Sequence, residues 1–348
     1  MVLVGDARPI RYRSLNSQEG ELRLLELQPA LTDNIDEPIV CRLVHETVSE
    51  SSEFIALSSL YGDASVTEHI LLDGVQVVIP LQLSEALRYI RAVFLTNFSP
   101  PPNSPTLRLQ SQKHSEQSLS ILKKRPPRWL VSLLKSFRNT SVQPSPRNGT
   151  PSLYIWLDLL CINRRDTREA SEQRSHMARA YRNAALVVGW LGTKDETSDL
   201  AIEIIRAWDR CMPESFGEPG DREAHPENYA PILQWMQPVA HLSEVPENIT
   251  DPREVPSYNA IFEFLNRPFF RNTWLLDEMS LARFPAFLLG DDIVSWMQIL
   301  RLNRVNEDIR DHGADMFPDE LRHLLQYMPL GSVFTFLEDF DQRQRERQ

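Results

Sequence analysis

Residue patterns typical of metal proteins, exported proteins and membrane proteins are scarce in this sequence. The chain has three cysteines, Cys41, Cys161 and Cys211, without CxxC spacing or nearby histidines, so we expect buried free thiols and no structural metal. No stretch reaches the roughly 18 uncharged apolar residues that cross a bilayer. The start, MVLVGDARPIRYR, lacks the apolar core of a secretory signal. These absences predict a cytoplasmic protein.

Positive charge is in the minority along the chain. The 37 lysines and arginines are outnumbered by 48 aspartates and glutamates, and the net formal charge of -11 argues against a general nucleic-acid-binding protein. The hydrophobic content of 42% is that of a globular protein. A chain of 348 residues is long enough for one large domain or two smaller ones.

In the segment 153–192, the spacing of apolar residues changes twice, from that of a strand to that of a helix and back to that of a strand. An apolar run over 153–159 predicts a strand buried on both faces, with Asp158 near its carboxyl end. Helical spacing then predicts a helix over 167–183, and the apolar, β-branched run 185–191 predicts a second strand. A helix that connects two such strands is the right-handed crossover of a parallel α/β sheet.

Earlier parts of the chain predict further strands over 22–27, 39–44 and 54–60, and a helix over 83–94. The third strand ends in the small, polar loop 58–63. Open α/β sheets place ligands at such carboxyl ends. Later elements are expected as helices over 198–211, 258–265, 294–302 and 320–328, and as a strand over 285–290.

Residues 96–151 are rich in Pro, Ser, Asn and basic residues and are far longer than a usual connection, so we expect a disordered insertion. Within it, residues 121–138 carry six basic and no acidic residues among apolar ones. A basic amphipathic helix of this kind makes weak contact with an anionic membrane or binds a calmodulin-like partner. The alternative is a short helix that docks its apolar side on the main domain, and both interpretations remain open.

Three separated blocks of sequence resemble the fungal heterokaryon incompatibility (HET) domain. The first, ALSSLYGD at 56–63, is similar to the family's ALSYxWG and leads to an LLDG turn and a helix. The second, at 156–177, is similar to WIDAxCINQxDxxEKxxQVxxM, with Arg164 where the family has Gln, and is followed by WLG. The third, RPFFRNTWLLDE at 267–278, is similar to RPYFxRxWxxQE. The resemblance covers most of residues 39–290 apart from the insertion.

The resemblance implies a TIR/flavodoxin-like α/β fold with a largely parallel sheet and flanking helices. In that picture residues 1–53 form an N-terminal strand pair, 54–290 form the HET domain, and 291–348 form a C-terminal helical extension. It also implies a signalling and assembly role in self/non-self recognition and programmed cell death. The implied partners are proteins, namely an upstream receptor-like activator and further copies of the chain.

A second, enzymatic reading comes from a more distant similarity to TIR domains, some of which cleave NAD. Cleaving the nicotinamide–ribose bond builds positive charge on the ribose carbon, and a nearby carboxylate stabilises it. The similarity implies Glu278 as the catalytic carboxylate of an NAD glycohydrolase. Ser58, Tyr61 and Asp158 would shape the pocket, and Trp274 would stack on a ring. NAD would then be the substrate, with no cofactor.

Each of these residues also has a structural interpretation. Glu278 would neutralise a neighbouring arginine, Asp158 would cap the following loop, and Trp274 would be a core aromatic. In the predicted helix 167–183, Glu169 and Gln173 are expected to join a hydrogen-bond network at the helix start rather than to act in catalysis. The signalling and enzymatic readings both remain open on the sequence.

Overall fold

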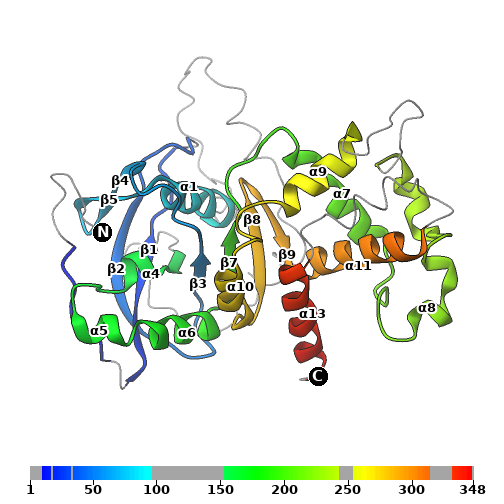
Figure 1. Ribbon diagram of the computed structural model, residues 1–348. Coiled ribbons are helices and arrows are strands. Elements are labelled where there is room, and N and C mark those ends of the chain that lie inside the picture. Colours follow the sequence, from blue (N-terminus) through cyan, green and yellow to red (C-terminus); the bar gives the residue numbers. More distant parts are fainter. Residues whose placement is uncertain are drawn as a thin grey trace, which may run out of the picture. The chain divides into compact units, whose positions relative to one another are not determined.

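The computed structural model describes residues 10–16, 19–32, 34–95, 153–242, 254–313 and 331–346. These fall into two compact units (Figure 1). The first unit comprises Met1–Gly192 and Leu281–Phe284, and the second comprises Thr193–Ser280 and Pro285–Gln348. The predicted insertion, its basic segment 121–138 and the predicted helix 320–328 lie outside the described residues. The predicted domain bounds at 53 and 290 stay predictions.

The first unit contains one mixed sheet, in which the strands follow the order β5-β4-β2-β1-β6-β3-β7. The strands are β1 (Glu21–Leu27), β2 (Val40–Thr47), β3 (Ile55–Ser58), β4 (Thr67–Leu72), β5 (Val75–Pro80), β6 (Leu153–Trp156) and β7 (Leu186–Trp190). The α/β class is thus confirmed.

The expectation of a largely parallel sheet needs correction. Strand β1 is antiparallel to both β2 and β6, and β4 is antiparallel to β5. Among the strands described in the first unit, only the β2–β4, β3–β6 and β3–β7 pairs are parallel. The β4–β5 pair is joined by a two-residue turn in which Asp73 and Gly74 both have positive φ, and so short a connection requires antiparallel strands. The predicted N-terminal strand pair therefore belongs to the same sheet.

The predicted strand-helix-strand segment is confirmed, with one difference in the helix. Strands β6 and β7 are parallel and lie on either side of β3. The connection has a short helix α4 (Asp158–Cys161), and the single predicted helix is divided at Glu172 into α5 (Thr167–Ser171) and α6 (Gln173–Asn183). Asp166 caps α5 by accepting hydrogen bonds from the backbone N–H groups of Arg168 and Glu169.

Helices cover both faces of the parallel part of the sheet. Trp156 of β6 packs edge-on against Tyr181 of α6, with ring centroids 5.3 Å apart. Trp190 of β7 stacks on Tyr89 of helix α1 (Leu81–Ile90) at 5.4 Å. Trp156 and Val187 both pair with Ala56 of β3, so their side chains lie on the same face of the sheet. Trp190 lies three positions after Val187 on β7, so its side chain lies on the opposite face. Because side chains alternate along a strand, α1 and α6 lie on opposite faces. The apolar stripe predicted for α1 is buried, and a π-helical turn, η2 (Arg91–Leu95), follows it.

A four-residue return of the chain, Leu281–Phe284, completes the first unit. The backbone N–H of Val187 donates to the carbonyl of Phe284 at 2.9 Å. Arg283 donates to the carbonyls of Ala184 at 3.0 Å and Asn183 at 3.1 Å, and it also contacts the carbonyl of Glu50. The Arg283 guanidinium thus links the segment before β7 to the loop before β3 by hydrogen bonds.

The second unit is mainly helical. Its helices are α7 (Ser198–Cys211), α8 (Asp221–Ala224), η4 (Pro226–Asn228), η5 (Gln234–Leu242), α9 (Pro256–Leu265), α10 (Thr273–Ser280), α11 (Trp296–His312) and α13 (Gly331–Arg345). Strands β8 (Pro285–Leu289) and β9 (Asp292–Ser295) form an antiparallel hairpin. The rings of Phe264, Phe269, Phe270 and Phe287 pack together in its core. None of the helices in the described ranges has the length and apolar character that crossing a membrane requires.

Candidate functional site

Three polar side chains meet at the carboxyl ends of β3 and β6. Asp158 follows β6 by two residues, and Tyr61 lies in the loop after β3. The Tyr61 hydroxyl donates to Asp158 Oδ1, and Arg164 Nη2 donates to Asp158 Oδ2 at 2.6 Å. Because β3 and β6 are parallel neighbours, their carboxyl ends share one edge of the sheet, where α/β proteins place ligands. We call Tyr61, Asp158 and Arg164 the carboxyl-edge cluster.

The Asp158 carboxylate is held in a partly desolvated position. Its side chain is 15% exposed, whereas that of Arg164 is 44% exposed. Burial raises the pKa of Asp158 above its usual range, and the nearby Arg164 charge acts in the opposite direction. The cluster therefore presents a solvent-accessible guanidinium and a phenol, both oriented by one enclosed acid.

The loop after β3 begins at a buried residue and contains a glycine with positive φ. Ser58 is the last residue of β3, is buried, and is level with Gly189 of β7. Gly62 has a φ of +67°, and a Cβ atom there would lie 2.6 Å from the side chain of Gln82. Glycine adopts this backbone conformation without strain, and the side chain of Gln82 is exposed and can move. The loop thus holds Tyr61 close to Asp158.

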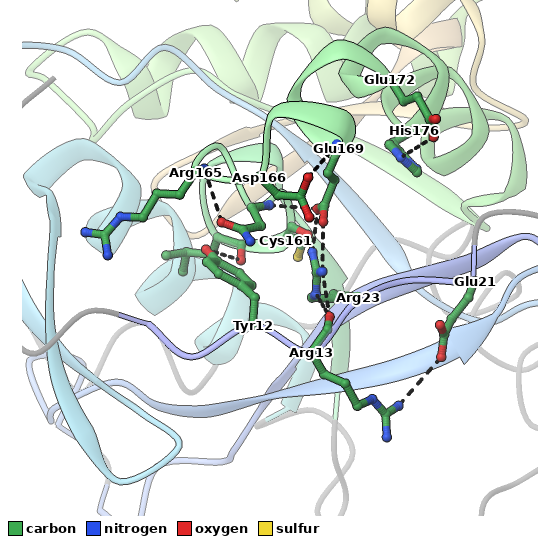
Figure 2. Close-up of polar contacts among 12 residues, drawn as sticks. Tyr12, Arg13, Glu21, Arg23, Cys161, Arg165, Asp166, Glu169, Glu172 and His176 are labelled. Atoms are coloured by element: carbon green, nitrogen blue, oxygen red, sulfur yellow. Dashed lines mark hydrogen bonds and ion pairs between the residues drawn. The ribbon is translucent and has the colours of Figure 1, made fainter.

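A buried ion pair lies beneath the other end of the Asp158 loop (Figure 2). Arg23 of β1, 1% exposed, donates Nη1 to Glu169 Oε1 at 2.5 Å and Nη2 to Oε2 at 2.9 Å. The same guanidinium donates to the carbonyls of Cys161 at 3.0 Å and Arg13 at 2.7 Å. This two-pronged geometry is the strongest that an arginine and a carboxylate form.

Further contacts extend this pair into a network around residues 158–169. Glu169 Oε1 accepts a hydrogen bond from the backbone N–H of Asn163 at 2.7 Å. The Tyr12 hydroxyl donates to the carbonyl of Leu160 at 3.1 Å, and the Arg23 guanidinium lies 4.8 Å from the Tyr12 ring centroid. The contacts tie the loop that carries Asp158 and Arg164 to β1 and to the N-terminal segment. We call Tyr12, Arg23, Asn163 and Glu169 the Arg23 network.

The expected role of Glu169 at the helix start is confirmed, but its partner was not foreseen. The sequence offered Gln173, whose side-chain amide instead lies 3.7 Å from the sulfur of Met177. The partner is Arg23, 146 residues earlier in the chain. The sequence indicates such a partner only through Arg23, a charged residue in the mainly apolar strand predicted over 22–27, because a buried arginine needs an acidic partner.

The two predicted site residues of the second unit lie on α10. Glu278 is buried, whereas the Trp274 side chain is 46% exposed, so the alternative of a core tryptophan is wrong at this position. The neighbouring arginines have contacts of their own. Arg267 donates to Asp195 Oδ2 at 2.6 Å, and Arg271 contacts the side-chain oxygen of Asn266.

The predicted site residues are thus brought together in part. The first unit places Ser58, Tyr61 and Asp158 at one edge of its sheet. Glu278 and Trp274 belong to the second unit. A single cleft containing all five stays a prediction.

The cysteines are unpaired. Cys41 and Cys161 are buried, and Cys211 is partly exposed. Burial raises the pKa of the Cys161 thiol to about 12. Over the part of the chain that the structure describes, no group of three or more His, Cys, Asp or Glu side chains could hold a metal ion.

Comparison with known proteins identifies the family. The family model described as "Heterokaryon incompatibility protein (HET)" matches residues 105–278, half of the chain, including the second and third sequence blocks. A curated relative, "Heterokaryon incompatibility protein 6, OR allele" of Neurospora crassa, is 22% identical over 306 residues, which cover 83% of this chain and 36% of the relative. The chain spans about a third of that relative's length. No solved structure matches this chain. The chain belongs to the heterokaryon incompatibility (HET) family, as its three sequence blocks indicated.

Proposed function

We propose that this protein is a cytoplasmic signalling module of fungal self/non-self recognition whose activation leads to programmed cell death. Membership of the HET family supports the proposal, as does a relative that is named a heterokaryon incompatibility protein. Its partners are an upstream receptor-like activator and further copies of the chain. The activity is that of recognition and assembly.

The carboxyl-edge cluster is the part of the first unit that we assign to this output. The observation that carries the assignment is the position of Asp158, whose pKa is raised by burial although Tyr61 and Arg164 both contact its carboxylate. An acid in this position costs stability at neutral pH, and proteins keep such costly groups mainly at functional sites. The half-exposed Arg164 is the member that a partner reaches first.

Adjacent arginines provide a matched test of this site. Arg164 binds Asp158, whereas Arg165 is also exposed and its backbone, rather than its side chain, contacts Asn163. We would express wild type, Arg164→Ala and Arg165→Ala from an inducible promoter in a filamentous fungus and count viable cells. Protein abundance would be measured in parallel. We expect Arg164→Ala, which removes the guanidinium that binds Asp158, to reduce killing strongly and Arg165→Ala to kill like wild type.

Two results would contradict the proposal at different levels. If Arg164→Ala kills as well as wild type at equal abundance, the cluster has no part in the output. If wild type leaves viability unchanged, both in growing hyphae and after hyphal fusion, the signalling proposal itself is wrong.

Cleavage of NAD by Glu278 gains no support from the comparisons, which name only heterokaryon incompatibility proteins. It can be separated from signalling by a second matched pair on α10, Glu278→Gln and Asp277→Asn. We expect cellular NAD to stay at its uninduced level until viability falls. An early loss of NAD that Glu278→Gln abolishes and Asp277→Asn preserves would replace our proposal with the enzymatic one.

A further inference from the structure

The outermost strand of the first unit's sheet has a neighbour on one side. Strand β5 lies at the end of the strand order, and within the described ranges β4 is the only strand that pairs with it (Figure 1). The outer edge of such a strand presents a row of backbone N–H and C=O groups to any further strand. The sheet can therefore be extended beyond β5.

The register between β4 and β5 decides which backbone groups point outward. Leu72 and Val75 flank the two-residue turn, so they exchange hydrogen bonds, and bonded and non-bonded pairs alternate from there. The next pair, Leu71 and Gln76, is a non-bonded one. In agreement, the N–H of Leu71 donates at 2.9 Å to the residue that precedes β2. Gln76 and, two positions later, Val78 thus direct their N–H and C=O groups away from β4.

Most of the devices that protect a strand edge are missing from β5. Its sequence, VQVVIP, has no charged side chain, and four of its six residues are β-branched. All six pair with β4 in an unbroken register, so the strand carries no bulge that would twist its edge away. Only Pro80, which has no N–H, limits pairing, and it does so at one end. The edge over 75–79 is therefore regular and uncharged.

The two faces of β5 differ in exposure. Ile79 is buried and pairs with Glu68, whose carboxylate accepts a hydrogen bond from Ser84 of α1, so α1 supports this face. Side chains alternate along a strand, which places Gln76 and Val78 on the other face. There Gln76 is exposed and Val78 is partly exposed. An added strand would thus be supported by the existing sheet while one of its faces met solvent.

We propose that β5 of one copy pairs antiparallel with β5 of a second copy, which joins the two sheets into one. The edge is self-complementary: with Gln76 opposite Val78 of the second copy, both residues of each copy use their outward N–H and C=O groups. Neutral side chains let two identical strands approach without like-charge repulsion. The same patch serves both copies, so the assembly closes as a two-fold dimer.

This inference rests on the proposed signalling function and names the surface through which copies of the module meet. One pair of edge strands buries a small interface, so association requires high protein concentration. It is a dimerisation step that an activator strengthens by bringing two copies together.

Lysines placed on the edge test the proposal in the full chain. The edge variant is Gln76→Lys with Val78→Lys, since lysine is a residue that protects natural edges. The control is Thr67→Lys with His69→Lys. Thr67 and His69 are exposed, and His69 pairs directly with Val78, so the control adds the same charges to the same face one strand further in.

The mass of the purified proteins is the readout, followed against concentration by light scattering. Wild type and the control should rise from the 40.2 kDa of one chain toward twice that mass. The edge variant should stay at the mass of one chain. Circular dichroism would show that each variant is folded.

Cross-linking tests the register and does not depend on the lysine variants. One chain carries Gln76→Cys and the other Val78→Cys, both with Cys211→Ser because Cys41 and Cys161 are buried. Residues directly opposite in a bonded antiparallel pair have Cα atoms about 5.5 Å apart, a separation that a disulfide spans. On oxidation, the equimolar mixture should form covalent dimers several-fold faster than either chain alone.

Three outcomes would overturn the proposal. They are a wild type that keeps the mass of one chain at every concentration, a folded edge variant that associates like wild type, and a mixture that cross-links no faster than its separate chains. If the edge variant fails to fold, the wild-type mass and the cross-linking still decide. Because both readouts come from purified protein, such a failure would remove this surface and leave the cell-death proposal to its own test with Arg164→Ala.

Discussion

Changing Glu169 to alanine would leave the Arg23 guanidinium buried without its counter-charge. Arg23 is 1% exposed and is bound by both carboxylate oxygens of Glu169. Removing one partner of a buried ion pair costs about 3–5 kcal/mol, because the remaining charge is still desolvated. Arg23 would keep its bonds to the carbonyls of Cys161 and Arg13, which places the expected loss near 3 kcal/mol.

The loss at Asn163 adds to this figure. Its backbone N–H donates to Glu169 Oε1, and a buried donor left without an acceptor costs about 1–3 kcal/mol. We therefore expect Glu169→Ala to destabilise the first unit by about 4–6 kcal/mol. Glu169→Gln keeps one acceptor and the side-chain shape, and should lose about 1.5–3 kcal/mol.

Hydrogen exchange is the suitable assay, since a chain with two compact units need not unfold in one step. Peptides from 158–171 should lose protection on the order of 100-fold or more in Glu169→Ala, at about 1.4 kcal/mol for each tenfold change. Peptides from α11, in the second unit, serve as the internal control and should be unchanged.

A double-mutant cycle decides whether the ion pair itself is responsible. Arg23→Ala combined with Glu169→Ala should cost less than the two single changes together, by about 2–3 kcal/mol, because no unpaired charge remains. Strictly additive costs would refute this reasoning, as would a loss below about 1 kcal/mol for Glu169→Ala.

Three further predictions concern the loops and the thiols. Because burial raises the pKa of Asp158 in the folded state, its contribution to stability falls as pH rises from the ordinary value of 3.8 through the raised value. Asp158→Asn should therefore gain thermal stability relative to wild type across that window, and a gap that narrows with rising pH would disprove the assignment. Gly62→Ala and Gly74→Ala should each cost about 1–2 kcal/mol in urea unfolding, because both residues have positive φ and the side chain of Gln82, which a Cβ at Gly62 would meet, is exposed and can move aside. A clearly larger cost at Gly62 than at Gly74 would contradict this reasoning. Iodoacetamide at pH 8 should label Cys211 in the folded protein and spare Cys161, whose pKa is about 12, until denaturant is added, as mass spectrometry of the peptides would reveal.

Local periodicity was sufficient to predict the strands and helices of residues 153–192. Strands β6 and β7 and a helix capped by Asp166 are present, because apolar spacing and capping act over a few residues. Periodicity did not predict the break at Glu172 or the order of the strands. Strand β1 lies between β2 and β6, and pairing at that distance leaves no mark on the spacing of apolar residues.

The candidate site was predictable to the same extent. Strand ends place Tyr61 and Asp158 at one edge, and the structure joins them. Arg164 stands where the family pattern has glutamine, and its contact with Asp158 became visible only in three dimensions. The same holds for Arg23 and Glu169, since an ion pair between residues 146 positions apart depends on the folded topology.

The short return at Leu281–Phe284 limits how this protein can be cut or recombined. A fragment that stopped at Gly192 would lack the carbonyl that Val187 binds and the guanidinium that gathers the carbonyls of Asn183 and Ala184. The start of β7 and the residues before it would then lack these hydrogen-bond partners. A gene fusion that carried only the first 192 residues would therefore not contain the complete first unit. Any exchange that preserves it must carry the intervening chain as well.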